Sequence, residues 1–141
     1  MAEKTIDIAS PILSRNERLA DQLRQRFKET NTYVINVLSS PGSGKTTTIL
    51  GTNERLRDKA GLRCAVIEGD IASDVDAITM KEAGMPAIQI NTGGLCHLEG
   101  NMIMEAVDAF DQAVGLDNID VIFIENVGNL VCPVDFDLGE N

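Results

Sequence analysis

The stretch SSPGSGKTTT, residues 39–48, has the residue types that hold phosphate groups. It follows the apolar string YVINVL and precedes a segment with helical character. Strand, glycine-rich loop and helix, in that order, form the context in which such a loop surrounds the phosphates of a nucleotide. Glycines let the backbone approach the phosphates, and successive N–H groups then point inward at them. This context favours a phosphate-binding loop over a glycine turn with a surface lysine.

The loop departs from the usual pattern G-x-x-x-x-G-K-S/T at one position, because Ser39 stands where the first glycine would be. We expect Lys45 to reach the β- and γ-phosphates, which makes it a candidate catalytic residue, and the Thr46 hydroxyl to bind Mg²⁺. The residues expected to bind the nucleotide in this loop are Gly42, Ser43, Gly44, Lys45, Thr46 and Thr47.

Carboxylates follow two later apolar segments that we interpret as strands. Asp70 comes after CAVIE and Glu125 comes after VIFI. Ligands of doubly wound sheets bind at the carboxyl ends of the strands, so both side chains are expected to hold Mg²⁺, directly or through water, and to border the nucleotide. The Gly128 N–H is expected to contact a γ-phosphate. Asp70 and Asp74 are candidate catalytic residues, with Asp74 or Asp76 orienting the attacking water, although Asp70 and Asp74 could instead cap the following helix.

Sulfur and imidazole groups form a second set of candidate ligands. Cys96 and His97 are adjacent after a Gly-Gly pair, and Cys132 follows the fourth expected strand. Thiolate and imidazole suit Zn²⁺ or Ni²⁺. Three donors per chain suit a transient site or one completed across a two-fold dimer axis. Spacing alone favours an incidental Cys-His pair, whereas the expected position beside the nucleotide favours a metal site. Cys64 lies inside an apolar strand and is expected to be a core residue.

Helical and strand patterns alternate along the chain. The expected helices cover residues 11–30, 44–60, 75–83 and 98–114, and the expected strands cover residues 33–38, 64–68, 87–90 and 121–124. Short, almost wholly apolar strands between helices imply a parallel sheet that is covered on both faces. The predicted fold class is therefore α/β: a three-layer P-loop NTPase fold with a mostly parallel sheet and an added N-terminal helix.

Composition narrows the class of protein further. The 141 residues carry a formal net charge of −10, which argues against binding to nucleic acid or to an anionic membrane. Three cysteines are too few and too scattered for a disulfide framework. No secretory signal and no long apolar run is visible, so we expect a cytoplasmic protein.

Four segments, SSPGSGKT, IEGDIASD, INTGGLCHLE and FIENVGNLVCPVDFDLGE, together resemble the hydrogenase nickel-incorporation GTPases of the HypB type. These belong to a branch of the P-loop GTPases that also contains the urease accessory GTPase. The resemblance implies GTP hydrolysis with Mg²⁺, dimerisation on GTP and metal binding, and delivery of nickel to the large subunit of nickel–iron hydrogenase. It also implies a nickel chaperone of the HypA type as a partner, and Cys96, His97 and Cys132 as ligands of nickel or zinc near the dimer interface.

The resemblance leads to a division of the chain. We expect a flexible tail at residues 1–10, an N-terminal packing helix at 11–31 and a partial GTPase domain at 32–141. Members of the family continue to an Asn-Lys-x-Asp motif that reads guanine, and these 141 residues contain no such motif. We therefore expect the domain to be incomplete at its C-terminus, and the preference for GTP over ATP rests on the resemblance.

Two other functions stay open at this point. One is a nucleotide-regulated nickel or zinc carrier without significant hydrolysis. The other is a GTPase of the urease accessory type, which is disfavoured because that group is expected to carry Cys-Pro-His, whereas Cys96 and His97 are adjacent here.

Overall fold

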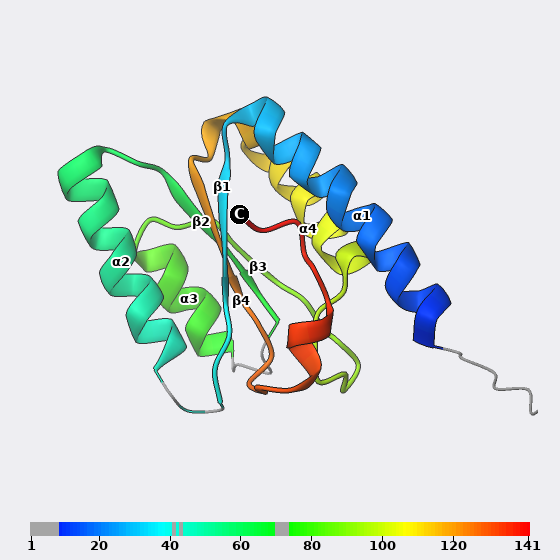
Figure 1. The fold of residues 1–141 in the computed structure, drawn as a ribbon. Coiled ribbons are helices and arrows are strands. Elements are labelled where there is room, and N and C mark those ends of the chain that lie inside the picture. Colours follow the sequence, from blue (N-terminus) through cyan, green and yellow to red (C-terminus); the bar gives the residue numbers. More distant parts are fainter. Residues whose placement is uncertain (1–8, 41, 43, 70–73) are drawn as a thin grey trace, which may run out of the picture.

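A parallel sheet forms the centre of the molecule (Figure 1). The computed structural model describes residues 9–40, 42, 44–69 and 74–141. The strands are Tyr33–Val37 (β1), Cys64–Glu68 (β2), Ala87–Gln89 (β3) and Val121–Glu125 (β4), in the order β1-β4-β2-β3. All three pairings are parallel, which confirms the predicted sheet.

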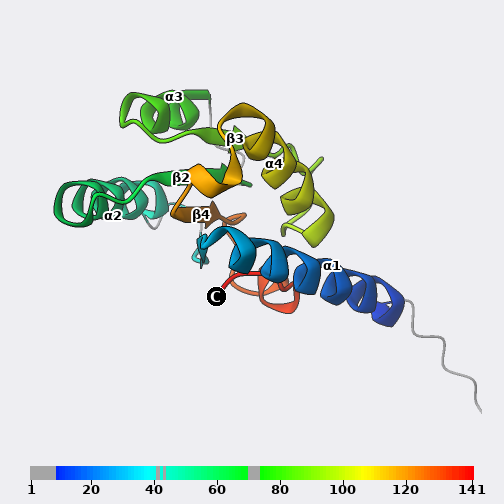
Figure 2. The same ribbon diagram turned by 90° about the horizontal axis from the view of Figure 1, so that it is seen from above.

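Helices cover both faces of this sheet. They are Ala9–Thr30 (α1), Lys45–Ala60 (α2), Asp74–Glu82 (α3) and Gly100–Ala113 (α4), with two short 3₁₀ helices at Leu116–Asn118 (η1) and Cys132–Asp135 (η2). Seen from above, α2 and α3 lie on one side of the strands while α1 and α4 lie on the other (Figure 2). The predicted α/β fold with an N-terminal helix is therefore confirmed. None of the helices in the described part of the chain is long and apolar enough to cross a membrane.

Two boundaries differ from expectation in ways that matter. Helix α1 begins at Ala9 and not at Pro11, because proline is tolerated within the first turn, where its missing N–H costs no helical hydrogen bond. Helix α4 begins at Gly100, two residues later than predicted, so Cys96 and His97 lie in the loop before the helix. The remaining ends coincide with the predicted ranges or differ from them by a single residue.

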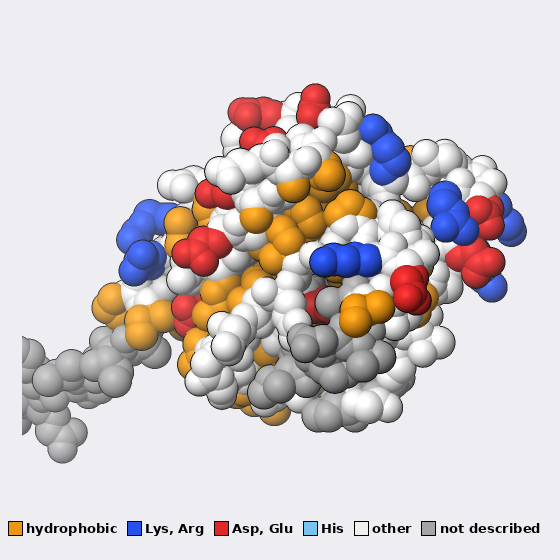
Figure 3. Space-filling view, turned by 180° about the vertical axis from the view of Figure 1, so that it is seen from behind, with side chains coloured by type: hydrophobic (Ala, Val, Ile, Leu, Met, Phe, Trp, Pro, Cys, Tyr) orange, Lys and Arg blue, Asp and Glu red, His pale blue; other side chains and the backbone are white. Residues whose placement is uncertain are grey.

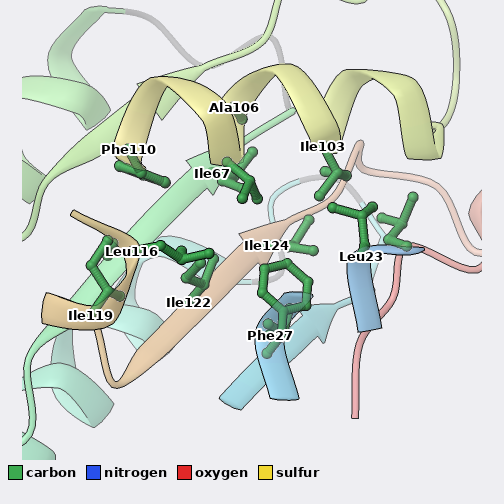
Figure 4. Packing of buried hydrophobic residues seen from close by; sticks show 14 of the residues in the cluster. Leu23, Phe27, Ile67, Ile103, Ala106, Phe110, Leu116, Ile119, Ile122 and Ile124 are labelled. Atoms are coloured by element: carbon green, nitrogen blue, oxygen red, sulfur yellow. The ribbon is translucent and has the colours of Figure 1, made fainter. Parts of the chain in front are cut away.

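Alternation along the strands divides the core into two layers. Ile122 and Ile124 of β4 face α1 and α4, where they join a cluster that includes Leu23, Phe27 and Phe110 (Figure 4). Their neighbours Val121 and Phe123 face the opposite way and join the cluster that contains Ile49 and Met80. Glu125 continues the second alternation, so its side chain belongs to the α2 side of the sheet.

Strands β1 and β3 form the two edges of the sheet. The open edge of β1 is met by Asn141, whose backbone N–H donates to Val34 O at 3.1 Å while its Oδ1 accepts from Val34 N at 2.8 Å. On the β3 side, Ala87 and Ile88 are half-buried, and hydrophobic side chains gather across the middle of the molecular surface (Figure 3).

Candidate functional site

The glycine-rich loop leads directly into a helix. Gly42 and Gly44 have φ angles of 72° and 91°, values that a residue with a side chain adopts only under strain. Gly44 caps α2, and Lys45, the first residue of that helix, is buried. The amide groups of a helix N-terminus favour anions. The exposed Thr47 follows in the same turn, and the positive φ angles and helix N-terminus of the described residues suit phosphate binding, which stays a prediction.

Thr46 and Glu125 meet across the gap between α2 and β4. The Thr46 hydroxyl donates to Glu125 Oε1 at 2.9 Å, and Glu125 is only 3% exposed. A hydroxyl and a carboxylate are hard oxygen ligands of the kind that Mg²⁺ takes beside a nucleotide. The two groups that the sequence predicted as magnesium ligands from distant segments therefore lie together, and their chemistry fits this ion.

A further buried carboxylate, Glu68, escaped the sequence analysis. It ends β2, is 0% exposed and stands in register with Glu125 on the neighbouring strand. Residues in register on parallel strands point to the same face, so Glu68 also belongs to the α2 side. An acidic residue at the end of a wholly apolar strand was the available signal.

Some predicted site residues lie wholly or partly outside the part of the chain that the structure describes. Ser43 and Asp70 lie outside the described residues. Asp74 begins α3, but its side chain and that of Asp76 also lie outside the description. Gly128 is half-buried, in the loop that follows β4. The roles of these residues stay predictions.

Asn126 links this loop to the strand that precedes the phosphate loop. Its backbone N–H donates to Val37 O at 3.2 Å, and its Nδ2 donates to Asn36 Oδ1 at 3.1 Å. The side chain is fully buried. Asn126 therefore ties the end of β4 to the end of β1, a role that the sequence analysis missed because the partner lies far away in the chain.

A tight turn presents Cys96 and His97. Gly93 and Gly94 have φ angles of 64° and 92°, and the Thr92 hydroxyl donates to Leu95 O at 3.2 Å across the turn. The Cys96 Sγ lies 3.7 Å from His97 Nδ1. The thiol and one ring nitrogen therefore face each other.

Two side chains fix the His97 ring. Nε2 lies 3.0 Å from Glu99 Oε1, and the ring stacks on Phe136 with a centroid distance of 4.0 Å and an interplanar angle of 13°. Burial lowers the His97 pKa, but the contacts with Cys96 and Glu99 outweigh it, so the net pKa is raised. Because a carboxylate only accepts, Nε2 carries the proton, which leaves the Nδ1 lone pair of the neutral ring toward the Cys96 thiol. A carboxylate behind an imidazole is a common arrangement at metal sites.

Cys132 approaches from the other side. The Asn129 Oδ1 accepts from the N–H groups of Val131 at 2.8 Å and Cys132 at 3.2 Å, which sets the first turn of η2. Interaction with the Cys132 thiol is the largest cause of a lowered Cys96 pKa, followed by the hydrogen bond to His97. The same interaction raises the pKa of Cys132.

The predicted ligands Cys96, His97 and Cys132 thus come together, and their soft donor set fits Ni²⁺ or Zn²⁺. Within the part of the chain that the structure describes, no three His, Cys, Asp or Glu side chains already stand in a geometry ready to hold a metal ion. Binding would need side-chain rotation. Cys64 is separate: it is buried in β2, as predicted for a core residue.

Residues 33–137 match the protein family described as CobW/HypB/UreG, nucleotide-binding domain. The chain belongs to the CobW/HypB/UreG family. Hydrogenase maturation factor HypB of Escherichia coli K12 is 47% identical over 137 residues, which cover 97% of this chain and 45% of the relative. Hydrogenase/urease maturation factor HypB of Helicobacter hepaticus is 44% identical over 97% of this chain and 55% of its own length. The chain therefore spans about half the length of these relatives.

Solved structures agree with this membership of the CobW/HypB/UreG family. HypB from Helicobacter pylori in complex with nickel matches with a TM-score of 0.78 and 41% identity, over 89% of this chain and 57% of that one. HypB from Archaeoglobus fulgidus matches with a TM-score of 0.79 and 39% identity, over 91% of this chain and 59% of that one. The resemblance to HypB-type proteins inferred from the sequence is confirmed.

Proposed function

We propose that this chain binds and hydrolyses GTP and uses the cycle to hold and release nickel during maturation of nickel–iron hydrogenase. One observation carries the proposal. A single segment that begins in β4 holds Glu125, which accepts a hydrogen bond from Thr46, and Cys132, whose thiol lowers the pKa of the Cys96 thiol. The likeness to hydrogenase maturation factors and to a nickel-bound HypB structure supports the choice of cargo.

In the nucleotide half, the loop amides and Lys45 neutralise the phosphate charge at the start of α2. Bound Mg²⁺ would polarise the phosphate oxygens, held there by Thr46 and Glu125. Asp74 or Asp76 is proposed to orient the attacking water, and Asp70 is proposed to hold Mg²⁺, directly or through water. Charge compensation by fixed groups is the main task of an enzyme in phosphoryl transfer, and a buried lysine on a helix terminus suits that task.

Coupling between the two halves runs through the residues after β4. The Gly128 N–H is proposed to contact the γ-phosphate, so departure of that phosphate releases the loop between Asn126 and Cys132. Cys132 then shifts relative to Cys96 and His97, which changes metal affinity. Because coupling free energies are reciprocal, bound metal must alter nucleotide affinity by the same factor.

We base the proposed oligomeric state, partners and location on the resemblance to the family. A homodimer forms on GTP and metal binding, with the Cys96, His97 and Cys132 donors near its interface and zinc as an alternative ligand. The partners are a nickel chaperone of the HypA type and the hydrogenase large subunit, and the location is the cytoplasm.

The test measures phosphate release and metal binding on the same preparation. We expect Mg²⁺-dependent release of phosphate from GTP, less from ATP, and a thiolate absorbance on nickel addition that changes when a nonhydrolysable GTP analogue replaces GDP. Cys132→Ser should remove the absorbance while leaving nucleotide binding intact. Metal binding that responds to nucleotide without any phosphate release would instead identify a nucleotide-regulated carrier. Absence of both signals would overturn the proposal.

A further inference from the structure

Asn16 of α1 makes two hydrogen bonds that reach different parts of the chain. Its Oδ1 accepts from the Gly100 N–H at 2.6 Å, and its Nδ2 donates to Asp137 O at 2.7 Å. The residue is 5% exposed; the bond to Gly100 is buried and the bond to Asp137 is partly buried. A buried amide with both ends occupied fixes the relative position of its two partners.

The first bond caps α4 from outside. Glu99 occupies the N-cap position of α4, but its side chain makes no capping bond. Asn16 supplies the acceptor for the first N–H of the helix. The Glu99 carboxylate therefore does not fold back onto the helix, and it instead meets His97 Nε2 at 3.0 Å. Gly100 allows this approach, since a Cβ there would lie 3.1 Å from Asn16 Oδ1.

The second bond holds the chain next to Phe136, the residue that stacks on the His97 ring. Arg24 Nη2 also donates to both carboxylate oxygens of Asp137, each at 2.8 Å, and so helps to hold this residue against α1. Gly139 then packs so closely on α1 that a Cβ would come within 2.7 Å of Leu23 Cβ. Helix α1 thus holds both neighbours of the imidazole: Glu99 through Gly100, and Phe136 through Asp137.

We infer that Asn16 is a positioning residue for the metal site, setting the tautomer and orientation of the His97 ring through Glu99 and Phe136. The inference rests on the proposed function, because it assumes that His97 binds metal. It gives α1 a task beyond packing: the helix keeps Nδ1 directed at Cys96. Residues behind a metal-binding imidazole change metal affinity by about 10–100-fold when they are replaced.

The test compares three variants of the full chain. Asn16→Leu has nearly the same shape but loses both bonds, and Asn16→Asp keeps the acceptor for Gly100 while it loses the donor to Asp137. Arg26→Met is the matched control, because Arg26 also links α1 to α4, through Asp108 and Asp111, without touching the ring's neighbours. Thermal melts and nucleotide affinity are recorded for each variant to confirm folding.

Two readouts decide the outcome. Nickel affinity, from competition with a chromophoric chelator, should fall about 10–100-fold in Asn16→Leu, less in Asn16→Asp, and stay within about twofold in Arg26→Met. His97 is the only histidine, so its ring ¹⁵N signals in the metal-free protein are unambiguous; they should show the Nε2–H tautomer in the wild type and a mixture in Asn16→Leu.

Unchanged affinity and tautomer in a folded Asn16→Leu protein would overturn the inference while leaving the proposed function intact. An equal loss in Arg26→Met would also overturn it, because loosened helix packing would then suffice. A wild-type protein that binds no metal would overturn the metal half of the proposed function, and this inference with it.

Discussion

The Leu98 side chain packs directly on the Cα of Gly69. A Cβ at Gly69 would lie 2.5 Å from both Cδ atoms of Leu98, closer than side-chain atoms can approach. Gly69 follows β2, and its N–H donates to Glu125 O at 2.8 Å. Leu98 follows His97 in the chain and is completely buried. This contact therefore joins the ends of two central strands to the loop that carries Cys96 and His97.

Gly69→Ala should destabilise the protein and displace that loop. Overpacking of this kind costs about 1–3 kcal/mol. A methyl at Gly51 in α2 meets nothing within 4 Å, so Gly51→Ala is the control and should add about 0.5–1 kcal/mol through helix propensity. Chemical denaturation measures both free energies of unfolding. Shortening Leu98 to Val should restore part of the loss in Gly69→Ala, and a lack of rescue would show that the contact is not the cause.

Lys45→Ala should abolish phosphate release from GTP, with a fall of at least about 100-fold, because the buried ammonium group is the fixed charge at the start of α2. Metal binding by the monomer should stay close to that of the wild type. Lys59→Ala, at the exposed end of the same helix, serves as the control. Equal loss of turnover and metal binding in Lys45→Ala would indicate unfolding.

The Arg24–Asp137 pair should give a stability difference that depends on pH. Burial raises the Asp137 pKa, but the hydrogen bonds from Arg24 and from the Gly139 N–H outweigh it, so the net pKa is lowered. A carboxyl with a lowered pKa stabilises the fold above its unfolded value of about 3.9 and loses that contribution as the pH falls through its folded pKa.

Arg24→Met should accordingly cost about 0.5–1 kcal/mol at pH 7, a discounted figure because both side chains are roughly 40% exposed. The difference from the wild type should shrink once the pH falls below about 4. Urea denaturation at several pH values measures it. A gap between Arg24→Met and the wild type that stayed constant as the pH fell would contradict the assignment.

Cys64 should resist alkylation. Burial, and secondarily the Asp120 charge, raises its pKa to about 11, so on the order of 0.1% is thiolate at pH 8. Cys96 and Cys132 are only half-buried. Intact mass after brief iodoacetamide treatment should show modification of those two cysteines and sparing of Cys64, whereas the denatured protein should take up label at all three. Equally fast labelling of Cys64 in the folded protein would refute this.

The sequence predicted the sheet well because its strands carry strong local signals. Runs such as CAVIE and VIFI are typical of strands buried in a parallel sheet, and Gly61 marked the end of α2. The start of α4 was misjudged because Leu98 continues the apolar spacing of the helix, while the capping group comes from Asn16 in a distant segment.

The site was predicted less completely for the same reason. The sequence analysis could name four candidate ligands because hydroxyl, carboxylate and thiol groups are known ligand types: Thr46, Glu125, Cys96 and Cys132. Phe136 has no such signal, since its importance arises only from stacking on His97 across the fold. Glu99 stands close to His97 in the chain, yet an acid before a helix is ordinarily a cap, and only the structure shows the carboxylate turned to the ring.

The chain after β4 leads from the end of the central sheet to the core beneath α1 and α4. Glu125 belongs to the α2 side of the sheet, where it meets Thr46, whereas Leu138 is buried with Leu23 in the core beneath α1 and α4. The residues between them are therefore held at both ends, by the Glu125–Thr46 hydrogen bond and by the burial of Leu138. We therefore expect a displacement of Glu125 to be carried toward Leu138 along the backbone of the intervening residues, which is a covalent route between the sheet and the core under α1 and α4.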